Sequence, residues 1–195
     1  MRREVEASLR RLGVDRIDLY QVHWPAEDGK PLEEYWQTMV DLRTEGKVRA
    51  IGLSNHNVDQ VTVAEKVGHV DSLQPPFSAI KRTAAAELAW CAANGTGAIV
   101  YSPMQSGLLT GAFSAERVAS LPADDWRRSA PEFTTNLERN LALTAALEPV
   151  AKRHSVPVAA VAVAVAWTLA WPGVTVRSWA PAARSRWTAG SRRST

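Results

Sequence analysis

Polar side chains stand directly after four short β-rich runs of this sequence. They are His23 after IDLYQV, Ser54-Asn55 after VRAIGL, Gln74 after VDSL, and Tyr101-Ser102 after AIV. An imidazole can polarise a substrate oxygen, and hydroxyl and amide groups can orient a bound molecule through hydrogen bonds. Because the carboxyl ends of parallel strands meet at one edge of a sheet, we expect these groups to line one mouth, where βα folds carry their sites.

Each of these groups, taken singly, also has a structural explanation. A histidine at a strand end is more often structural, an asparagine after a strand usually caps a helix, and a glutamine commonly makes a loop contact. Four polar strand ends in series are harder to explain in this way. The series therefore predicts a ligand site.

The elements that must position these groups alternate between strand and helix. Four strands are expected, at Ile17–His23, Val48–Leu53, Val70–Leu73 and Ala98–Tyr101. Six helices are expected, at Arg2–Leu12, Leu32–Glu45, Asn57–Val67, Ala84–Ala93, Leu137–His154 and Pro157–Ala170. Ser155 is the expected cap of the last helix, and residues 112–135 are expected to form a long functional loop.

This alternation predicts an α/β fold with a parallel sheet. A closed (β/α)8 barrel needs roughly 250 residues, so the 195 residues here can supply only part of one. A doubly wound sheet is compatible with the same pattern.

The composition is that of a globular protein, with 46% hydrophobic and 22% charged residues. No run reaches the ~18 apolar residues of a membrane span, and the first residues, MRREVE, contain no apolar signal region. The single Cys91 excludes an internal disulfide and fits a reducing compartment. We therefore expect a cytoplasmic protein.

The basic character of the chain, with a pI of about 9.3, comes from its last residues. Residues 176–195 contain five of the 23 basic residues and no acidic residue, whereas residues 1–175 contain 18 basic and 20 acidic residues. A basic tail can bind nucleic acid, which leaves a basic-tailed binding module as an alternative function. The net negative charge of the rest argues against nucleic acid as a partner.

Three sequence blocks resemble consecutive signatures of the aldo-keto reductases. They read LGVDRIDLYQVHWP, EGKVRAIGLSNHN and IVYSPMQSGLLTGAF, and they occur in the order typical of that family. The last block is most similar to the bacterial branch with a YSPxxxGLLTG loop. The resemblance covers residues 1–175 and implies a truncated (β/α)8 barrel that uses NADPH to reduce aldehydes or ketones.

The same resemblance implies a role for each candidate residue. His23 would be catalytic and would hydrogen-bond the substrate carbonyl, while Ser54, Asn55 and Gln74 would hold the nicotinamide carboxamide. Tyr101 would stack on the nicotinamide ring. The loop over the pyrophosphate would comprise Ser102, Pro103, Met104, Ser106 and Leu108. No metal is implied.

The resemblance also implies that other family features lie before Met1. These are the first three strands and the tyrosine, lysine and aspartate that supply the proton. Residues 1–175 would then be a partial barrel of about the fourth to seventh βα units plus the C-terminal helices. On this interpretation the chain alone is inactive. The alternative is a non-catalytic remnant, or a regulatory cofactor-binding protein with the same fold, like the potassium-channel β-subunits.

Residues 176–195 depart from the family, which has a last strand and a phosphate-binding segment there. One possible coding of VRSWAPAARSRWTAGS, with a single G restored in front, translates as GAIVGARSPEQVDGWI. The latter has the pattern of the family segment. We therefore predict a single-base deletion beside the Thr175 codon, and an aberrant, disordered basic tail over residues 176–195.

Overall fold

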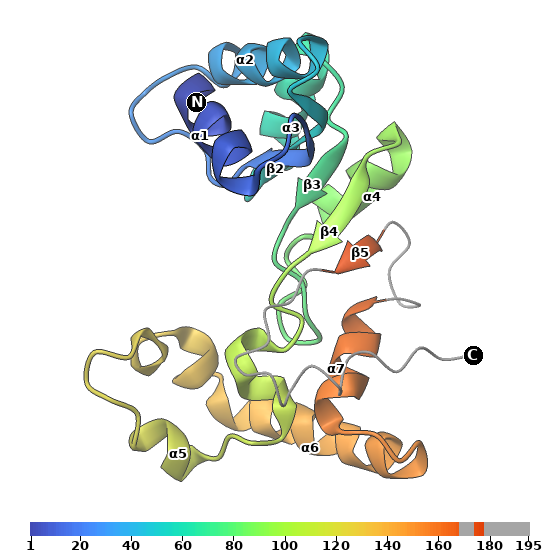
Figure 1. Ribbon diagram of the computed structural model, residues 1–195. Coiled ribbons are helices and arrows are strands. Elements are labelled where there is room, and N and C mark those ends of the chain that lie inside the picture. Colours follow the sequence, from blue (N-terminus) through green and yellow to red (C-terminus); the bar gives the residue numbers. More distant parts are fainter. Residues whose placement is uncertain (168–173, 178–195) are drawn as a thin grey trace. The chain divides into compact units, whose positions relative to one another are not determined.

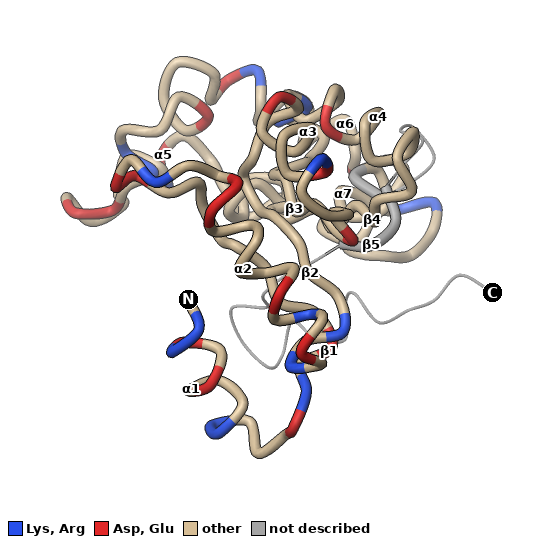
Figure 2. Tube along the Cα trace, turned by 90° about the horizontal axis from the view of Figure 1, so that it is seen from above, with Lys and Arg blue, Asp and Glu red and all other residues tan. Residues whose placement is uncertain are grey.

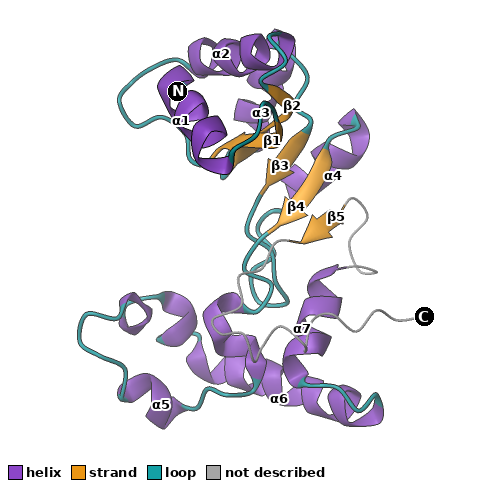
Figure 3. Cartoon of the chain, in the orientation of Figure 1, coloured by secondary structure: helices purple, strands orange, loops and turns teal. Residues whose placement is uncertain are grey.

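The computed structural model describes residues 1–167 and 174–177. Five parallel strands form one sheet: β1 (Ile17–Val22), β2 (Val48–Ser54), β3 (Ser72–Gln74), β4 (Gly97–Val100) and β5 (Val174–Arg177). Their spatial order, β1-β2-β3-β4-β5, follows the sequence without reversal. A doubly wound sheet reverses its strand order at a switch point, so the fold is the α/β arc of a barrel rather than that alternative (Figures 1 and 3).

The chain divides into two compact units. Within the described residues, the first comprises residues 1–75, 83–100 and 174–177, and the second comprises residues 76–82 and 101–167. The first unit contains the sheet with α1 (Arg2–Leu12), α2 (Leu32–Thr44), α3 (Val58–Val67) and α4 (Ala85–Asn94). The second contains η1 (Gln105–Thr110), α5 (Ala115–Ala119), η2 (Trp126–Arg128), η3 (Pro131–Phe133), α6 (Leu137–Arg153) and α7 (Val158–Trp167).

Helix ends in the first unit follow from local sequence. Helix α1 ends at Gly13, which adopts φ 67° and ψ 33°, a left-handed conformation that glycine reaches without a steric penalty. Helix α3 begins with a capping box, in which Asn57 and Gln60 each accept a hydrogen bond from the other's backbone N–H. These signals explain why the predicted helices and the observed ones agree to within one or two residues.

Buried aliphatic and aromatic side chains form the core between the helices and the sheet of the first unit. Trp36, Met39 and Leu42 of α2 are fully buried, as are Ile51 and Leu53 of β2. The Trp36 indole donates to the Gly68 carbonyl at 2.8 Å, so its one polar atom is satisfied inside the core. Burying five such side chains contributes roughly 1.5–3 kcal/mol each.

Helix α1 is held to its neighbours by ion pairs. The Arg2 guanidinium contacts Glu45 at 2.6 Å and Asp41 at 3.3 Å, and Lys47 contacts Glu6. Acidic and basic residues are interspersed along the described trace rather than gathered by sign (Figure 2). Exposed ion pairs of this kind are screened by water and contribute little to stability, so they fix the position of α1 more than they stabilise the fold.

Two strand predictions need correction. The third strand is Ser72–Gln74, not Val70–Leu73. The Val70 N–H donates to the Glu65 carboxylate, and the Val70 carbonyl accepts from the Thr96 hydroxyl, so side chains occupy the backbone groups that a strand would need. A fifth strand, Val174–Arg177, pairs with β4 although only four were predicted. Its β-branched Val-Thr-Val run suits a strand, and it includes residues 176 and 177 of the predicted tail.

The predicted cap at Ser155 is also wrong. Ser155 has φ 52° and belongs to the end of α6. Its N–H donates to the Lys152 carbonyl, and the Val156 N–H donates to the Ala151 carbonyl. This pair of bonds is a Schellman motif, which takes a left-handed residue just past the helix end. Helix α7 is described from Val158 to Trp167, and residues 168–170 of its predicted span lie outside the described residues.

The expected loop of residues 112–135 contains short helices. Ser114 accepts a hydrogen bond from the Arg117 N–H and so caps α5, and η2 and η3 follow. Phe113 and Phe133 meet edge to face at 5.4 Å, and Phe133 is buried with Leu108 and Val118. The segment therefore has a small core of its own. Residues 178–195, the rest of the predicted tail, lie outside the described part of the chain.

Candidate functional site

The predicted site residues of the first unit follow the carboxyl ends of adjacent strands. In the sheet register Val22 faces Leu53, and Ser54 faces Gln74. His23 directly follows β1, Ser54 and Gln74 end β2 and β3, and Asn55 directly follows β2. The structure thus brings together four of the six residues expected to gather at one mouth, His23, Ser54, Asn55 and Gln74.

Hydrogen bonds tie these strand ends to one another. The Ser54 hydroxyl donates to the Gln74 carbonyl at 2.8 Å, and the Asn55 N–H donates to the same oxygen at 3.3 Å. The Asn55 side-chain amide donates to the His23 carbonyl at 2.9 Å and to the Ser54 hydroxyl at 3.1 Å. Asn55 has φ 62°, a left-handed conformation that asparagine tolerates better than most residues. This turn therefore holds three strand ends in one arrangement.

His23 presents its ring to solvent. The residue is exposed, and its imidazole lies 5.7 Å from the Trp24 indole, centroid to centroid, with the planes tilted by 46°. The hydrogen bond from the Asn55 side chain holds its backbone carbonyl, and the imidazole is available to a ligand at the end of β1. This is the position from which a histidine could hydrogen-bond a carbonyl oxygen.

A second row of polar groups, two residues before the strand-end residues His23 and Gln74, was not predicted. The Gln21 side-chain amide donates to the Ser72 hydroxyl at 3.1 Å, and the Gln74 side-chain amide donates to the Gln21 side-chain oxygen Oε1 at 3.4 Å. The signal was present in the sequence, because Gln21 precedes His23 by two residues and so shares its face of the strand. The other positions of β1 are mostly apolar. A second polar residue on the face of His23 therefore marks Gln21 as a further candidate site residue.

Gly52 makes this second row possible. It lies between Gln21 and Ser72 in the register, and their hydrogen bond passes over it. A Cβ at this position would lie 2.1 Å from the Ser72 hydroxyl, 2.7 Å from the Ser72 carbonyl oxygen and 3.0 Å from Cγ of Gln21. Only glycine leaves room for the two flanking side chains to meet.

His56 is another site-adjacent residue that the sequence analysis missed. It is 2% exposed, and its Nδ1 lies 2.8 Å from the Ser54 carbonyl oxygen. Its Nε2 lies 2.9 Å from the Tyr35 hydroxyl. Burial lowers the pKa of His56, against the smaller opposing effect of the bond to Ser54. The ring therefore stays neutral near physiological pH.

The remaining predicted residues belong to the second unit. Tyr101 pairs with Pro76 as an isolated bridge, and its carbonyl accepts from the Phe77 N–H at 3.0 Å. The following loop has positive φ at Ser102 (55°), Gln105 (45°), Ser106 (52°) and Gly107 (97°). Such left-handed positions are uncommon outside glycine. Backbone turned in this way can direct N–H groups toward an anion.

Individual side chains of this loop differ in exposure. Ser106 is exposed, Ser102 and Met104 are half-buried, and Pro103 is buried. Leu108 is fully buried and packs with Val118 and Phe133. Its side chain is therefore a core element, and only its backbone could face a cofactor.

Gln105, which was not predicted, is buried and explains the shape of the loop. Its side-chain oxygen accepts from the Ser78 hydroxyl at 2.9 Å, and its N–H donates to the Ser102 carbonyl at 2.9 Å. The Ser78 hydroxyl in turn accepts from the N–H groups of Ile80 and Lys81. This network holds the left-handed backbone in place.

The three tyrosines of the chain share one electrostatic property. Burial raises the pKa of Tyr20, of Tyr35 and of Tyr101. A tyrosine that donates a proton near neutral pH needs the opposite shift. None of the three is therefore suited to be a general acid.

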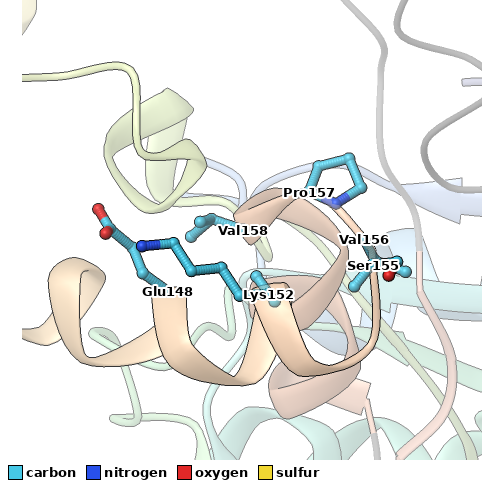
Figure 4. Close-up of a pocket in the computed structure, with 7 residues that line it drawn as sticks. Glu148, Lys152, Ser155, Val156, Pro157 and Val158 are labelled. Carbon is cyan, nitrogen blue, oxygen red and sulfur yellow. The ribbon is translucent and has the colours of Figure 1, made fainter.

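A surface hollow of about 500 Å³ lies elsewhere, between α6 and α7 (Figure 4). Its lining residues are Glu148, Ala151, Lys152, Ser155, Val156, Pro157 and Val158. It includes none of the predicted site residues. The strand-end cluster has the polar groups that chemistry would need, so we place the candidate site there.

Comparison with known proteins assigns the family. Residues 1–179 match the model of the aldo/keto reductase family, and the chain belongs to that family. It is 35% identical over 179 residues to the aldo-keto reductase YhdN of Bacillus subtilis (strain 168), covering 90% of this chain and 53% of that protein. It is 39% identical over 121 residues to the NADH-specific methylglyoxal reductase of Escherichia coli (strain K12), covering 60% and 37% respectively.

Solved structures agree with this assignment. A glycerol dehydrogenase from Gluconobacter oxydans superposes with a TM-score of 0.81 at 35% identity, covering 92% of this chain and 54% of its own. The chain thus spans about half the length of the relatives that it matches. The predicted fold, part of an aldo-keto reductase barrel, is confirmed. In the described residues no helix is long and apolar enough to cross a membrane.

Proposed function

We propose that this chain is the nicotinamide-binding part of an NADPH-dependent oxidoreductase that reduces aldehydes or ketones. One observation carries the proposal: His23, Ser54, Asn55 and Gln74 converge at adjacent strand ends and are joined by hydrogen bonds. Hydroxyl and amide groups of this kind match the donors and acceptors of a carboxamide. The cofactor, when bound, supplies the hydride.

Each residue contributes positioning rather than covalent chemistry. Ser54, Asn55 and Gln74 would hold the carboxamide and so select the face of the ring that is presented to substrate. His23 would donate a hydrogen bond to the carbonyl oxygen and stabilise the charge that develops there. Tyr101 would stack on the nicotinamide, and the loop from Ser102 through Leu108 would receive the pyrophosphate on backbone N–H groups.

The second candidate function is cofactor binding without turnover. It is favoured by the raised pKa of all three tyrosines, because burial holds each phenol neutral and makes it a weaker acid. General acid catalysis typically contributes about 10²–10⁴-fold. A chain that binds NADPH but has no proton donor would act as a regulator, or as a binding element that completes its site with another segment.

The test is calorimetric titration of the purified chain with NADPH and, separately, with NADH. We expect NADPH to bind, and Gln74→Ala to raise its Kd about five- to tenfold, the effect of losing one hydrogen bond. Gln37→Ala is the matched control, because Gln37 is exposed on α2 and its side chain donates to Asp41, away from the strand ends. Equal Kd values for the two variants would contradict the assignment of the site.

Turnover is measured separately, by following NADPH absorbance in the presence of a small aldehyde. Binding without oxidation favours the non-catalytic alternative, and oxidation abolished by His23→Ala favours the reductase. Absence of binding to either nucleotide contradicts both. We further expect a cytoplasmic protein, with a small carbonyl compound rather than nucleic acid as its partner.

A further inference from the structure

The buried His56 and the half-buried Tyr35 lie next to the strand-end site, and the proposed function does not use them. His56 follows Asn55 directly and contacts two groups, the Ser54 carbonyl oxygen and the Tyr35 hydroxyl, at 2.8 and 2.9 Å. Tyr35 belongs to α2, 21 residues earlier in the chain. The two rings meet edge to face with centroids 6.2 Å apart.

The chemistry of the acceptors fixes the direction of these hydrogen bonds. A carbonyl oxygen can only accept, so the His56 Nδ1 must carry the proton and donate to Ser54. In the neutral ring Nε2 then has only a lone pair, so it accepts from the Tyr35 hydroxyl. The result is a series of two hydrogen bonds, in which the Tyr35 hydroxyl donates to His56 and the His56 ring donates to the Ser54 carbonyl. Because His56 is 2% exposed, water cannot readily replace either bond.

The Ser54 carbonyl links these hydrogen bonds to the candidate site, because Ser54 is itself one of the site residues. The side chain of Ser54 donates to the Gln74 carbonyl, and the next residue, Asn55, adopts φ 62°. A left-handed conformation is unfavourable for residues other than glycine and persists only where its surroundings hold it. A donor on the peptide just before Asn55 restrains that conformation.

We propose that His56, oriented by Tyr35, is a positioning residue that fixes the Ser54–Asn55 turn for binding of the nicotinamide carboxamide. The binding part of this inference rests on the proposed function. The structural part does not, because it concerns the turn itself. A phenylalanine at position 56 could fill the same space, but it could not donate to the Ser54 carbonyl.

The first experiment measures amide hydrogen exchange by NMR in three variants of the full chain. Tyr35→Phe removes one hydroxyl, His56→Phe removes both bonds, and His56→Asn retains a donor near the position of Nδ1. We expect the Asn55 amide, which donates to Gln74, to exchange about tenfold faster in His56→Phe. His56→Asn should restore most of the protection, and Tyr35→Phe should fall between them.

The Ile51 amide, which donates to the Asp71 carboxylate at 2.8 Å, is the control for loss of global stability. Equal acceleration at Ile51 and Asn55 would mean that His56 is only a core residue, and unchanged exchange at Asn55 would refute the role entirely. In wild type the ¹⁵N shifts of the His56 ring should report a protonated Nδ1 near neutral pH. A protonated Nε2 with a bare Nδ1 would also overturn the proposal.

The second experiment measures the NADPH Kd of the same variants, each shown to be folded by circular dichroism. We expect Kd to rise in the order Tyr35→Phe, then His56→Phe, with rescue in His56→Asn. An unchanged Kd in folded His56→Phe would refute the link to binding. If wild type itself does not bind NADPH, the proposed function fails, and hydrogen exchange still decides whether His56 fixes the turn.

Discussion

Replacing Gly52 with alanine should be among the most damaging single-methyl changes in this chain. The added Cβ would lie 2.1 Å from the Ser72 hydroxyl and 2.7 Å from the Ser72 carbonyl oxygen. The hydroxyl can rotate away, but the carbonyl belongs to the backbone of β3 and cannot. Relief therefore requires β2 and β3 to move apart where they are hydrogen-bonded.

The magnitude follows from two effects. Overpacking of a well-packed site costs about 1–3 kcal/mol, and losing the Gln21–Ser72 hydrogen bond costs about 1 kcal/mol more. We expect Gly52→Ala to lower the free energy of unfolding by about 2–4 kcal/mol. Because Ser72 is 5% exposed, its displaced hydroxyl would have little access to water as a substitute partner.

The assay is urea unfolding followed by tryptophan fluorescence, with the buried Trp36 among the reporters. At an m-value of about 2 kcal/mol/M, the midpoint should fall by roughly 1–2 M. Gly97→Ala is the matched control, because Gly97 also lies in a strand and its added Cβ would meet only the Asp71 carbonyl, at 3.4 Å. That variant should stay within about 1 kcal/mol of wild type.

The double variant Gly52→Ala/Ser72→Ala separates the two obstacles. It removes the hydroxyl but not the backbone carbonyl at 2.7 Å, so we expect partial recovery. Equal stability of Gly52→Ala and Gly97→Ala would refute the reasoning. Full recovery in the double variant would show that the side chain alone, and not the spacing of the strands, limits this position.

Three further predictions concern other parts of the chain. Ser155→Gly should raise the free energy of unfolding by about 1 kcal/mol in urea melts, because Ser155 occupies a left-handed helix end at φ 52°; a loss of stability would contradict the motif. The Cys91 thiol, whose pKa is raised to about 12 by burial and then by the Glu87 charge, should react with a thiol reagent at pH 8 only after unfolding. Rapid labelling of the native chain would contradict this. Hydrogen bonds from Arg127 lower the pKa of Asp125 to about 2. Since this folded-state pKa lies below the ordinary 3.8, the contribution of the pair is present above pH 3.8 and is lost as pH falls toward 2. The exchange protection of the Arg127 amide, which donates to Asp125 at 3.0 Å, should fall over that range and should be low at all pH values in Asp125→Ala.

Local sequence was sufficient for most helices because their end signals act within a few residues. Gly13 and Gly95 both adopt the left-handed conformation at helix ends, and Asn57 caps α3 through its own side chain. The prediction that Ser155 caps the last helix was wrong, although a serine before an apolar helix usually is its N-cap. Here Ser155 belongs to the C-terminal motif of the preceding helix, α6. Which of two adjacent helix ends such a residue joins depends on how the two helices pack.

By itself the sequence determined the α/β class, the order of the first four strands and of the helices between them, and the polar groups after those strands, His23, Ser54-Asn55, Gln74 and Tyr101-Ser102. These follow from periodicity and from local end signals, which the chain carries whatever its surroundings. Only the tertiary structure decided that Gln21 reaches Ser72 over Gly52, that Tyr35 reaches His56, and that Leu108 is a core residue. The Gln21–Ser72 and Tyr35–His56 hydrogen bonds join residues 51 and 21 positions apart. Their existence depends on strand register and helix placement, which are set by the packing of the whole unit rather than by any short stretch of it.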